Sequence, residues 1–159
     1  MLTLRTDIPL LVIELSLLAL VIIAGIIVGS VFIYRSLKAT FKEVFRQQSK
    51  FDIELRKAAN LVSKIVKDPG FDQYRDAVVK DLGFEDKKII LELVDSMYAQ
   101  IDVTDSDNRY VVETYDNLQE IRRVLAAKVL QYNKKITLFP FNIFARLLKM
   151  QVMSHYAHQ

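Results

Sequence analysis

Few side chains in this sequence could carry out chemistry, and histidine is the first type to consider. The two histidines, His155 and His158, lie three residues apart near the C-terminus, where they could share a helix face and bind a metal ion. No carboxylate lies near them in the sequence, and chain ends are often disordered. We therefore expect no metal site and no other cofactor.

The composition also argues against nucleophilic catalysis. Cysteine is absent from the 159 residues, which removes both thiolate chemistry and disulfides. A serine or threonine nucleophile would need a nearby base. No glycine-rich loop that could hold a phosphate occurs either. The sequence therefore predicts a protein that is not an enzyme and has no catalytic residues.

Basic residues are concentrated in the C-terminal part of the chain. Seven Lys or Arg and no Asp or Glu occur from residue 121 to 159, although the net charge is only +3. Such an excess could attract nucleic acid. These residues are spread along a predicted helix, however, where most would form a solvated face or pair with acids such as Glu92 and Asp95. We therefore predict no nucleic-acid binding.

The elements that would position any site begin with an apolar N-terminal segment. From Leu15 to Tyr34 there are 20 residues without a charge, about the length that crosses the hydrocarbon core of a bilayer. The segment is longer than the apolar core of a signal peptide, and it continues directly into helical sequence. We therefore predict an N-terminal flank and transmembrane anchor over residues 1–34, followed by a helical domain over residues 35–159.

The charges that flank the anchor predict its orientation. Five Lys or Arg and one Glu lie between Arg35 and Lys50, whereas the N-terminal flank offers Arg5 and the amino terminus. The positive-inside rule places the more basic flank in the cytoplasm. We expect a single-pass membrane protein with its N-terminus outside and its helical domain in the cytoplasm.

Two features of the anchor itself bear on function. Gly25 and Gly29 form a GxxxG motif, which lets two membrane helices approach closely, although a lipid-facing glycine pair is an open alternative. Glu14 is an acid within the apolar segment, but it lies near the outer end, where its carboxylate can reach the bilayer surface. The motif makes the anchor a candidate surface for self-association.

Heptad spacing predicts a long helix after the anchor. Apolar residues from Leu37 to Ile65 alternate at spacings of four and three, with Gln48 as the one polar member. No helix breaker separates this stretch from the anchor. One helix should therefore run from the membrane to about Lys67, and Asp68–Gly70 should end it.

Two more long helices are predicted, over residues 71–103 and about 111–136, with the polar loop 104–108 between them. Gly83 is expected either to break or to kink the first of these two helices. Short loops make neighbouring helices antiparallel. The first helix would leave the membrane, the second would return and the third would leave again. The acidic loop would then lie near the membrane, and the corner at Phe139–Phe141 would lie at the far end, beside Asp68–Gly70.

The predicted fold class is therefore all-α. An N-terminal transmembrane helix would continue into a long antiparallel three-helix bundle, and a short fourth helix would follow at the C-terminus. Pro140 should end the third helix, because proline disfavours helix at the preceding residue and has no N–H to donate. Asn142 is the expected N-cap of the fourth helix.

The fourth helix is predicted to be a contact surface. It mixes apolar residues with Arg146 and Lys149, and a basic amphipathic helix can bind a membrane or a partner. In the three-helix geometry it lies far from the bilayer, so we expect it either to cap the bundle or to contact a neighbouring subunit. Its surplus apolar surface favours the second role. The interaction candidates are Gly25, Gly29, Phe139, Pro140, Phe141, Phe144, Leu147 and Leu148.

Several short motifs near the C-terminus resemble those of the LemA family of bacterial proteins. They are Arg122-Arg123, "YNKKI" at residues 132–136 and "FPFNIFA" at residues 139–145. The stretch "FDIELRKAANLV", residues 51–62, looks like a further family motif that ends in Asn-Leu-Val. The resemblance covers the anchor and both ends of the helical domain.

The resemblance implies a membrane-anchored helical bundle of a bacterial protein that is not an enzyme. We expect this protein to act as a non-catalytic scaffold or adaptor in the bacterial inner membrane. Together with the candidate surfaces above, the resemblance leads us to expect a homo-oligomer formed through the membrane helix and the C-terminal helix. Some members of the family lie beside HtpX-type membrane metalloproteases, and others belong to magnetosome systems. The alternatives are therefore an accessory partner of such a protease in envelope quality control, and a membrane-shaping or organelle-biogenesis protein.

Overall fold

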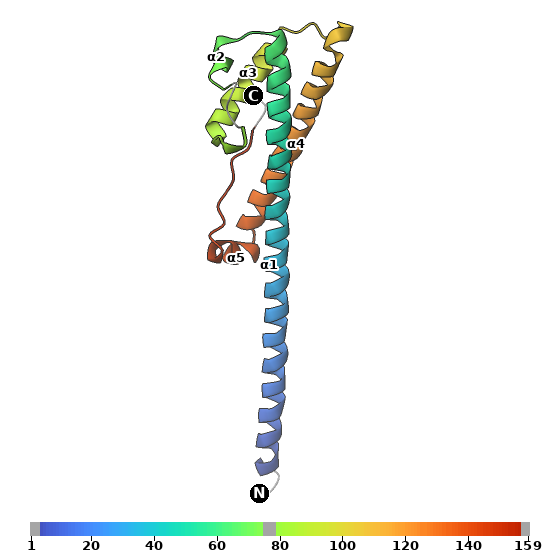
Figure 1. Cartoon of the computed structure of the whole chain (residues 1–159). Helices are drawn as coiled ribbons and strands as arrows, with labels where there is room; N and C mark the ends of the chain where they lie inside the picture. The colour runs from blue at the N-terminus through green and yellow to red at the C-terminus, as the bar shows by residue number, and fades with distance from the viewer. Residues whose placement is uncertain (1–3, 75–78, 157–159) are drawn as a thin grey trace.

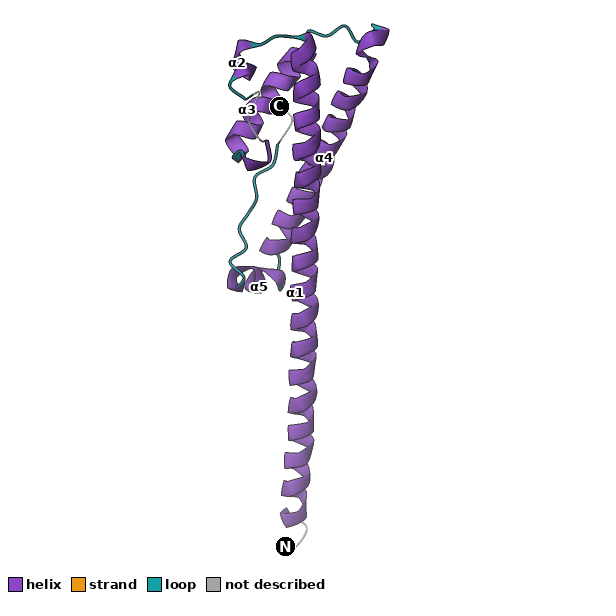
Figure 2. Ribbon diagram, in the orientation of Figure 1, coloured by secondary structure: helices purple, strands orange, loops and turns teal. Residues whose placement is uncertain are grey.

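The structure is a computed structural model that describes residues 4–74 and 79–156. All regular elements in these residues are helical, which confirms the predicted all-α class (Figure 2). In chain order they are α1 (Leu4–Ile65), α2 (Pro69–Asp72), the 3₁₀ helix η1 (Val79–Asp81), α3 (Phe84–Tyr98), the 3₁₀ helix η2 (Ser106–Asn108), α4 (Arg109–Thr137) and α5 (Phe141–Leu147).

Helix α1 is one continuous helix of 62 residues, as the missing breaker between the anchor and the heptad region predicted. Its N-terminal half stands alone, whereas its C-terminal half packs against the rest of the chain (Figure 1). The helix ends close to the predicted stop. Asp68 accepts a hydrogen bond of 2.7 Å from the backbone N–H of Gly70 and so caps the short helix α2.

Helix α4 packs antiparallel against the C-terminal half of α1. Near the start of α4, the Lys57 ammonium lies 5.1 Å from the centre of the Tyr110 ring. Near its end, the Lys135 ammonium donates a hydrogen bond of 2.9 Å to the Thr40 hydroxyl. The heptad positions of both helices form the core between them. Buried members of these stripes are Leu37, Val44, Phe51, Leu55, Ala58 and Val62 on α1, and Val111, Leu118, Leu125, Val129, Tyr132 and Ile136 on α4.

The prediction of one long helix over residues 71–103 is wrong. Only α3, with 15 residues, is a long helix there. Gly83 is its N-cap and has an extended backbone, with φ −66° and ψ 171°. Glycine has a low helix propensity, so the helix begins after it instead of passing through it. Of the two effects expected at Gly83, the structure shows the break, and a separate, shorter helix starts after it.

The short α3 changes the direction of α4. Helix α3 starts part of the way along the bundle and runs back toward the end where α1 stops (Figure 1). Helix α4 therefore starts at the end far from the anchor and runs toward it. The predicted locations of the two loops are wrong for this reason. Residues 104–108 lie at the far end, and the corner after α4 lies where the unpacked part of α1 begins. We call the corner and α5, residues 138–147, the base of the bundle.

Crosslinking within one chain tests this direction. The chain has no cysteine, so Thr40→Cys with Lys135→Cys introduces the only two thiols, at positions whose native side chains are hydrogen bonded. We expect a short bis-maleimide to link them within a monomer. The pair Lys67→Cys with Lys135→Cys should not be linked. These two positions would be close only if α4 ran away from the anchor, as the sequence analysis predicted. The opposite pattern on peptide mapping would contradict the fold.

Candidate functional site

The base of the bundle is where α4 ends and the chain turns sharply. Leu138 leaves the helix with an extended backbone, φ −83° and ψ 142°. The Phe139–Pro140 peptide bond is cis. The end of α4 at Thr137 confirms the predicted effect of Pro140, since the residues before it leave the helix.

The predicted capping role of Asn142 is wrong. Helix α5 begins at Phe141, so Pro140 holds the N-cap position and no side chain caps the helix. Asn142 lies inside the first turn, and its backbone N–H donates a hydrogen bond of 2.9 Å to the carbonyl of Leu138. A backbone carbonyl of the corner, and not a side chain, therefore accepts a hydrogen bond from the first turn of α5.

Helix α5 is short, as predicted, but it ends at Leu147, so Lys149 lies outside it. Lys149 has a left-handed backbone, φ 53°, directly after the helix. The N–H of Met150 then donates to the carbonyl of Ala145, at 2.9 Å, and the N–H of Lys149 donates to that of Arg146, at 3.1 Å. This pair of bonds is a Schellman motif, which satisfies the last carbonyls of a helix and ends it.

The chain after α5 is an extended tail that ties α1, α3 and α4 together. The side-chain amide of Asn133 bonds both the N–H and the carbonyl of Met153, at 2.9 and 2.8 Å. The Tyr156 ring stacks on Phe51 of α1 and on Phe84 of α3, with centroids 4.7 and 4.6 Å away. Burial, together with the nearby Asp52 carboxylate, raises the pKa of Tyr156, so its hydroxyl stays neutral.

The structure divides the predicted interaction residues into two groups. Phe141 and Phe144 turn inward and pack partly against the core, and the Lys135 ammonium lies 5.4 Å from the Phe141 ring centre. Phe139 and Leu147 point outward and are 78% and 74% exposed. Pro140 is half-buried at the turn, and Leu148 is exposed. Two of the predicted aromatic contacts thus belong to the fold, and the others form surface.

Gly25 and Gly29 lie far from the base, on the unpacked part of α1. A Cβ atom at either position would meet nothing within 4 Å. Neither glycine is therefore required by packing within a single chain. The structure brings the two glycines to one face of the helix, but not near the C-terminal candidates.

A buried ion pair between α1 and α3 has no counterpart in the sequence predictions. The Lys87 ammonium lies 2.9 Å from both carboxylate oxygens of Asp52, and the two side chains are 5% and 10% exposed. Burial raises the pKa of Asp52, against the lowering effect of Lys87. The one signal in the sequence is that Lys87 lies three, four and seven residues before apolar positions of α3, on the buried face.

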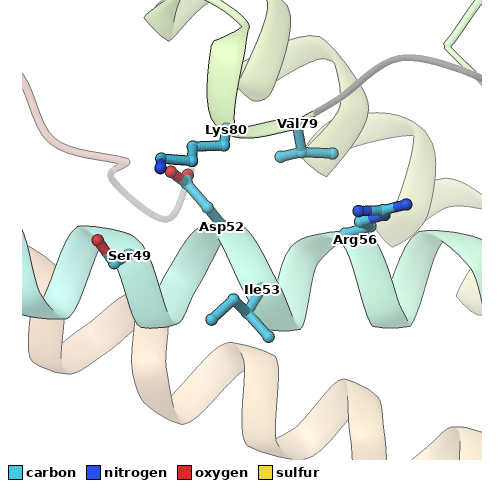
Figure 3. A pocket seen from close by; sticks show the side chains of 6 residues that line it. All are labelled: Ser49, Asp52, Ile53, Arg56, Val79 and Lys80. Carbon is cyan, nitrogen blue, oxygen red and sulfur yellow. The ribbon is translucent and has the colours of Figure 1, made fainter.

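A hollow of about 300 Å³ lies beside this pair, between α1 and η1 (Figure 3). In the close view, the Lys80 side chain reaches toward the Asp52 carboxylate, and Arg56 lies at the opposite end. Its lining consists of Ser49, Asp52, Ile53, Arg56, Val79 and Lys80. Its one carboxylate, Asp52, is already paired with the Lys87 ammonium. We therefore interpret the hollow as a gap in the packing between α1 and η1.

A second polar network links α3 to α4. The Arg122 guanidinium contacts the Asp95 carboxylate at 3.2 Å, and the Tyr115 hydroxyl and Gln119 amide donate to it at 2.9 and 3.0 Å. Burial raises the pKa of Tyr115, and its bond to Asp95 adds to the shift. Pairing of a C-terminal basic residue with Asp95 agrees with the sequence analysis, and it makes Arg122 part of the fold.

The structure does not place His155 in a group of possible metal ligands. His155 lies exposed in the extended tail, and His158 lies outside the described residues. Within residues 4–74 and 79–156, no three His, Asp or Glu side chains are grouped as a metal site would require. Comparison with protein-family models, with curated proteins and with solved structures finds no match to this chain.

The Asp52–Lys87 pair makes a prediction for stability. Asp52→Asn leaves a buried ammonium without its counter-charge and should lower the free energy of unfolding by about 3–5 kcal/mol. The double variant Asp52→Leu with Lys87→Met should recover most of that loss, because both buried charges are removed. Denaturant unfolding of the detergent-solubilised chain measures both, and similar losses in the two variants would contradict the assignment.

Proposed function

We propose that this protein is a membrane-anchored, non-catalytic helical scaffold or adaptor of the LemA type that associates with copies of itself. The observation that carries the proposal is α1, in which one continuous helix is apolar and unpacked over its first half and forms the core of the bundle over its second half. A single helix shared in this way is a stiff link between a bilayer and a cytoplasmic domain.

The first half of α1 has the surface that a lipid-facing helix needs. Every large apolar side chain from Leu10 to Phe32 is exposed. The two serine hydroxyls within this stretch donate to backbone carbonyls of their own helix, Ser16 to Ile13 at 2.8 Å and Ser30 to Ile26 at 2.7 Å. Polar groups in hydrocarbon must be satisfied internally, so these bonds support residence in a membrane.

The charges around the membrane exit support a cytoplasmic domain. Arg35, Lys38, Lys42, Arg46 and Lys50 follow the apolar segment, and Arg35 and Lys38 are exposed at its end. By the positive-inside rule this flank stays in the cytoplasm, and the N-terminus lies outside. The resemblance to the LemA family supports the inner membrane of a bacterium as the location.

Self-association is supported by the surface that a single chain leaves uncovered. Gly25 and Gly29 lie one turn apart on the unpacked half of α1, with open space where side chains would be. Small residues at this spacing allow two helices to approach and pack. The long helix would then hold neighbouring bundles side by side at the membrane surface, which is a scaffold's function.

Anchoring is tested first, by extraction. We expect alkaline carbonate to leave the full-length protein in the membrane pellet, because release of the exposed apolar half of α1 into water is costly. Detergent should release it. Quantitative release by carbonate alone would refute the anchor.

Self-association is tested separately in mild detergent. Gly25→Leu with Gly29→Leu should weaken the oligomer by about tenfold or more in dissociation constant, roughly 1.4 kcal/mol, since bulk is placed in the contact. Ile27→Leu with Val31→Leu changes the opposite face of the same helix and should leave association unchanged. Sedimentation equilibrium measures both. A wild-type chain that stays monomeric at all concentrations would overturn the claim.

A further inference from the structure

The base of the bundle carries an apolar surface that the fold does not cover. Leu138 and Phe139 at the corner are 50% and 78% exposed, and Ile143 and Leu147 on α5 are 50% and 74% exposed. Ile143 and Leu147 are four residues apart and so lie on one face of the helix. The opposite face, with Phe141, Phe144 and Ala145, packs inward. Helix α5 is therefore apolar on two sides, and only one side is used by the bundle.

The position of this surface along the axis of α1 shows that it lies beside the end of the apolar segment. Lys135, two residues before the end of α4, donates hydrogen bonds to the carbonyl of Ser36 and the hydroxyl of Thr40. The unbroken apolar segment ends at Tyr34. Ser36 is about 6 Å along the helix from the exposed Phe32, at 1.5 Å per residue. The corner after Lys135 therefore lies at the height where α1 would enter the bilayer.

The orientation of α5 fits a planar surface at that height. Helix α5 crosses the direction of α1 at the base, whereas α4 runs along it (Figure 1). A helix that lies in the plane of a bilayer can bury one apolar face between the headgroups and the acyl chains. Along the axis of α1, the outward residues of α5 lie next to the exposed apolar segment of α1. Both apolar surfaces would therefore contact the same bilayer.

The positive charges around the base favour contact with an anionic surface. The exposed basic residues there are Arg35, Lys38, Lys134, Arg146 and Lys149. No Asp or Glu occurs after Glu120, and Glu43 is the one acid between residues 35 and 50. Each Lys or Arg close to an anionic leaflet strengthens binding to that leaflet.

A second copy of this chain is a poorer occupant. A symmetric contact through the base would bring the same basic residues of two chains together, and like charges at short distance repel. The lipid surface, in contrast, is complementary in charge and supplies hydrocarbon for the apolar residues.

We propose that the base of the bundle, residues 138–147 with the basic residues around it, is a lipid-binding surface seated in the anionic cytoplasmic leaflet beside the protein's own anchor. This inference rests on the proposed membrane anchor. Together, α1 and the base give the bundle two attachments to the bilayer, so its tilt and its rotation about α1 are both restricted. The face that each bundle presents to its neighbours is then the same in every copy.

Fluorescence quenching in vesicles tests the proposal on the full chain. Because the protein has no cysteine, Leu147→Cys, Val28→Cys and Val103→Cys each provide one site for an environment-sensitive dye, and all three native side chains are exposed. The vesicles contain phosphatidylcholine and phosphatidylglycerol with a quencher on the acyl chain near the headgroup. We expect quenching at Leu147 at the base and at Val28 in the anchor, and none at Val103 near the far end.

The outcomes separate the base from the anchor. Quenching at Val28 with full access of a water-soluble quencher to Leu147 would overturn the lipid-binding base and leave the anchor intact. Protection of Leu147 from both quenchers would mean that a second copy covers the base, and would also overturn the proposal. No quenching at Val28 would refute the anchor, and the inference that rests on it.

Charge variants test the role of the anionic leaflet. Arg146→Gln with Lys149→Gln should reduce the quenching at Leu147 in anionic vesicles, because two attractions to headgroups are lost. Lys64→Gln with Lys67→Gln removes the same charge from exposed positions at the far end of the bundle and should have no effect. Equal quenching in both variants would contradict the electrostatic part of the proposal.

Discussion

The antiparallel packing of α4 along the second half of α1 determines where every surface of this protein lies. The two heptad stripes bury Leu37 to Val62 against Val111 to Ile136, and this contact extends over most of α4. Because α4 runs toward the apolar half of α1, its end and the whole of α5 are carried to the height where α1 would leave a membrane. A parallel α4 with the same residues would have placed the corner about 45 Å away, the length of a helix of that size.

The remaining elements strengthen this contact without adding to its length. Helix α3 covers one side of α1, and the Asp52–Lys87 and Asp95–Arg122 pairs connect it to α1 and α4. The extended tail then packs against α1 and α3, and the Tyr156 ring stacks on both Phe51 and Phe84. Each of these contacts is polar or aromatic and directional, so the bundle has one arrangement rather than a set of sliding helices. The scaffold proposed above, linked to a membrane by one helix, would require such rigidity.

The features that depend on local sequence could be predicted, and those that depend on topology could not. The period of the apolar residues predicted α1 and α4 to within a few residues, and Asp68–Gly70 and Pro140 predicted where helices stop. Gly83 was recognised as a position that could break or kink the helix, but a single sequence does not distinguish these two effects. That single ambiguity reversed the direction of α4 and exchanged the two ends of the bundle. The Asp52–Lys87 pair is 35 residues apart in the chain, and no local pattern connects its members.

In the proposed arrangement the base of the bundle faces the bilayer, and residues 104–108 face away from it. Energy transfer from a donor on the full-length protein to acceptors on lipid headgroups measures this directly, with the donor at Thr137→Cys or at Ser106→Cys. These positions lie at opposite ends of α4, which is roughly 45 Å long. Efficient transfer from Thr137 and weak transfer from Ser106 is the expected result. Efficient transfer from Ser106 with weak transfer from Thr137, or equal transfer from both, would contradict the account.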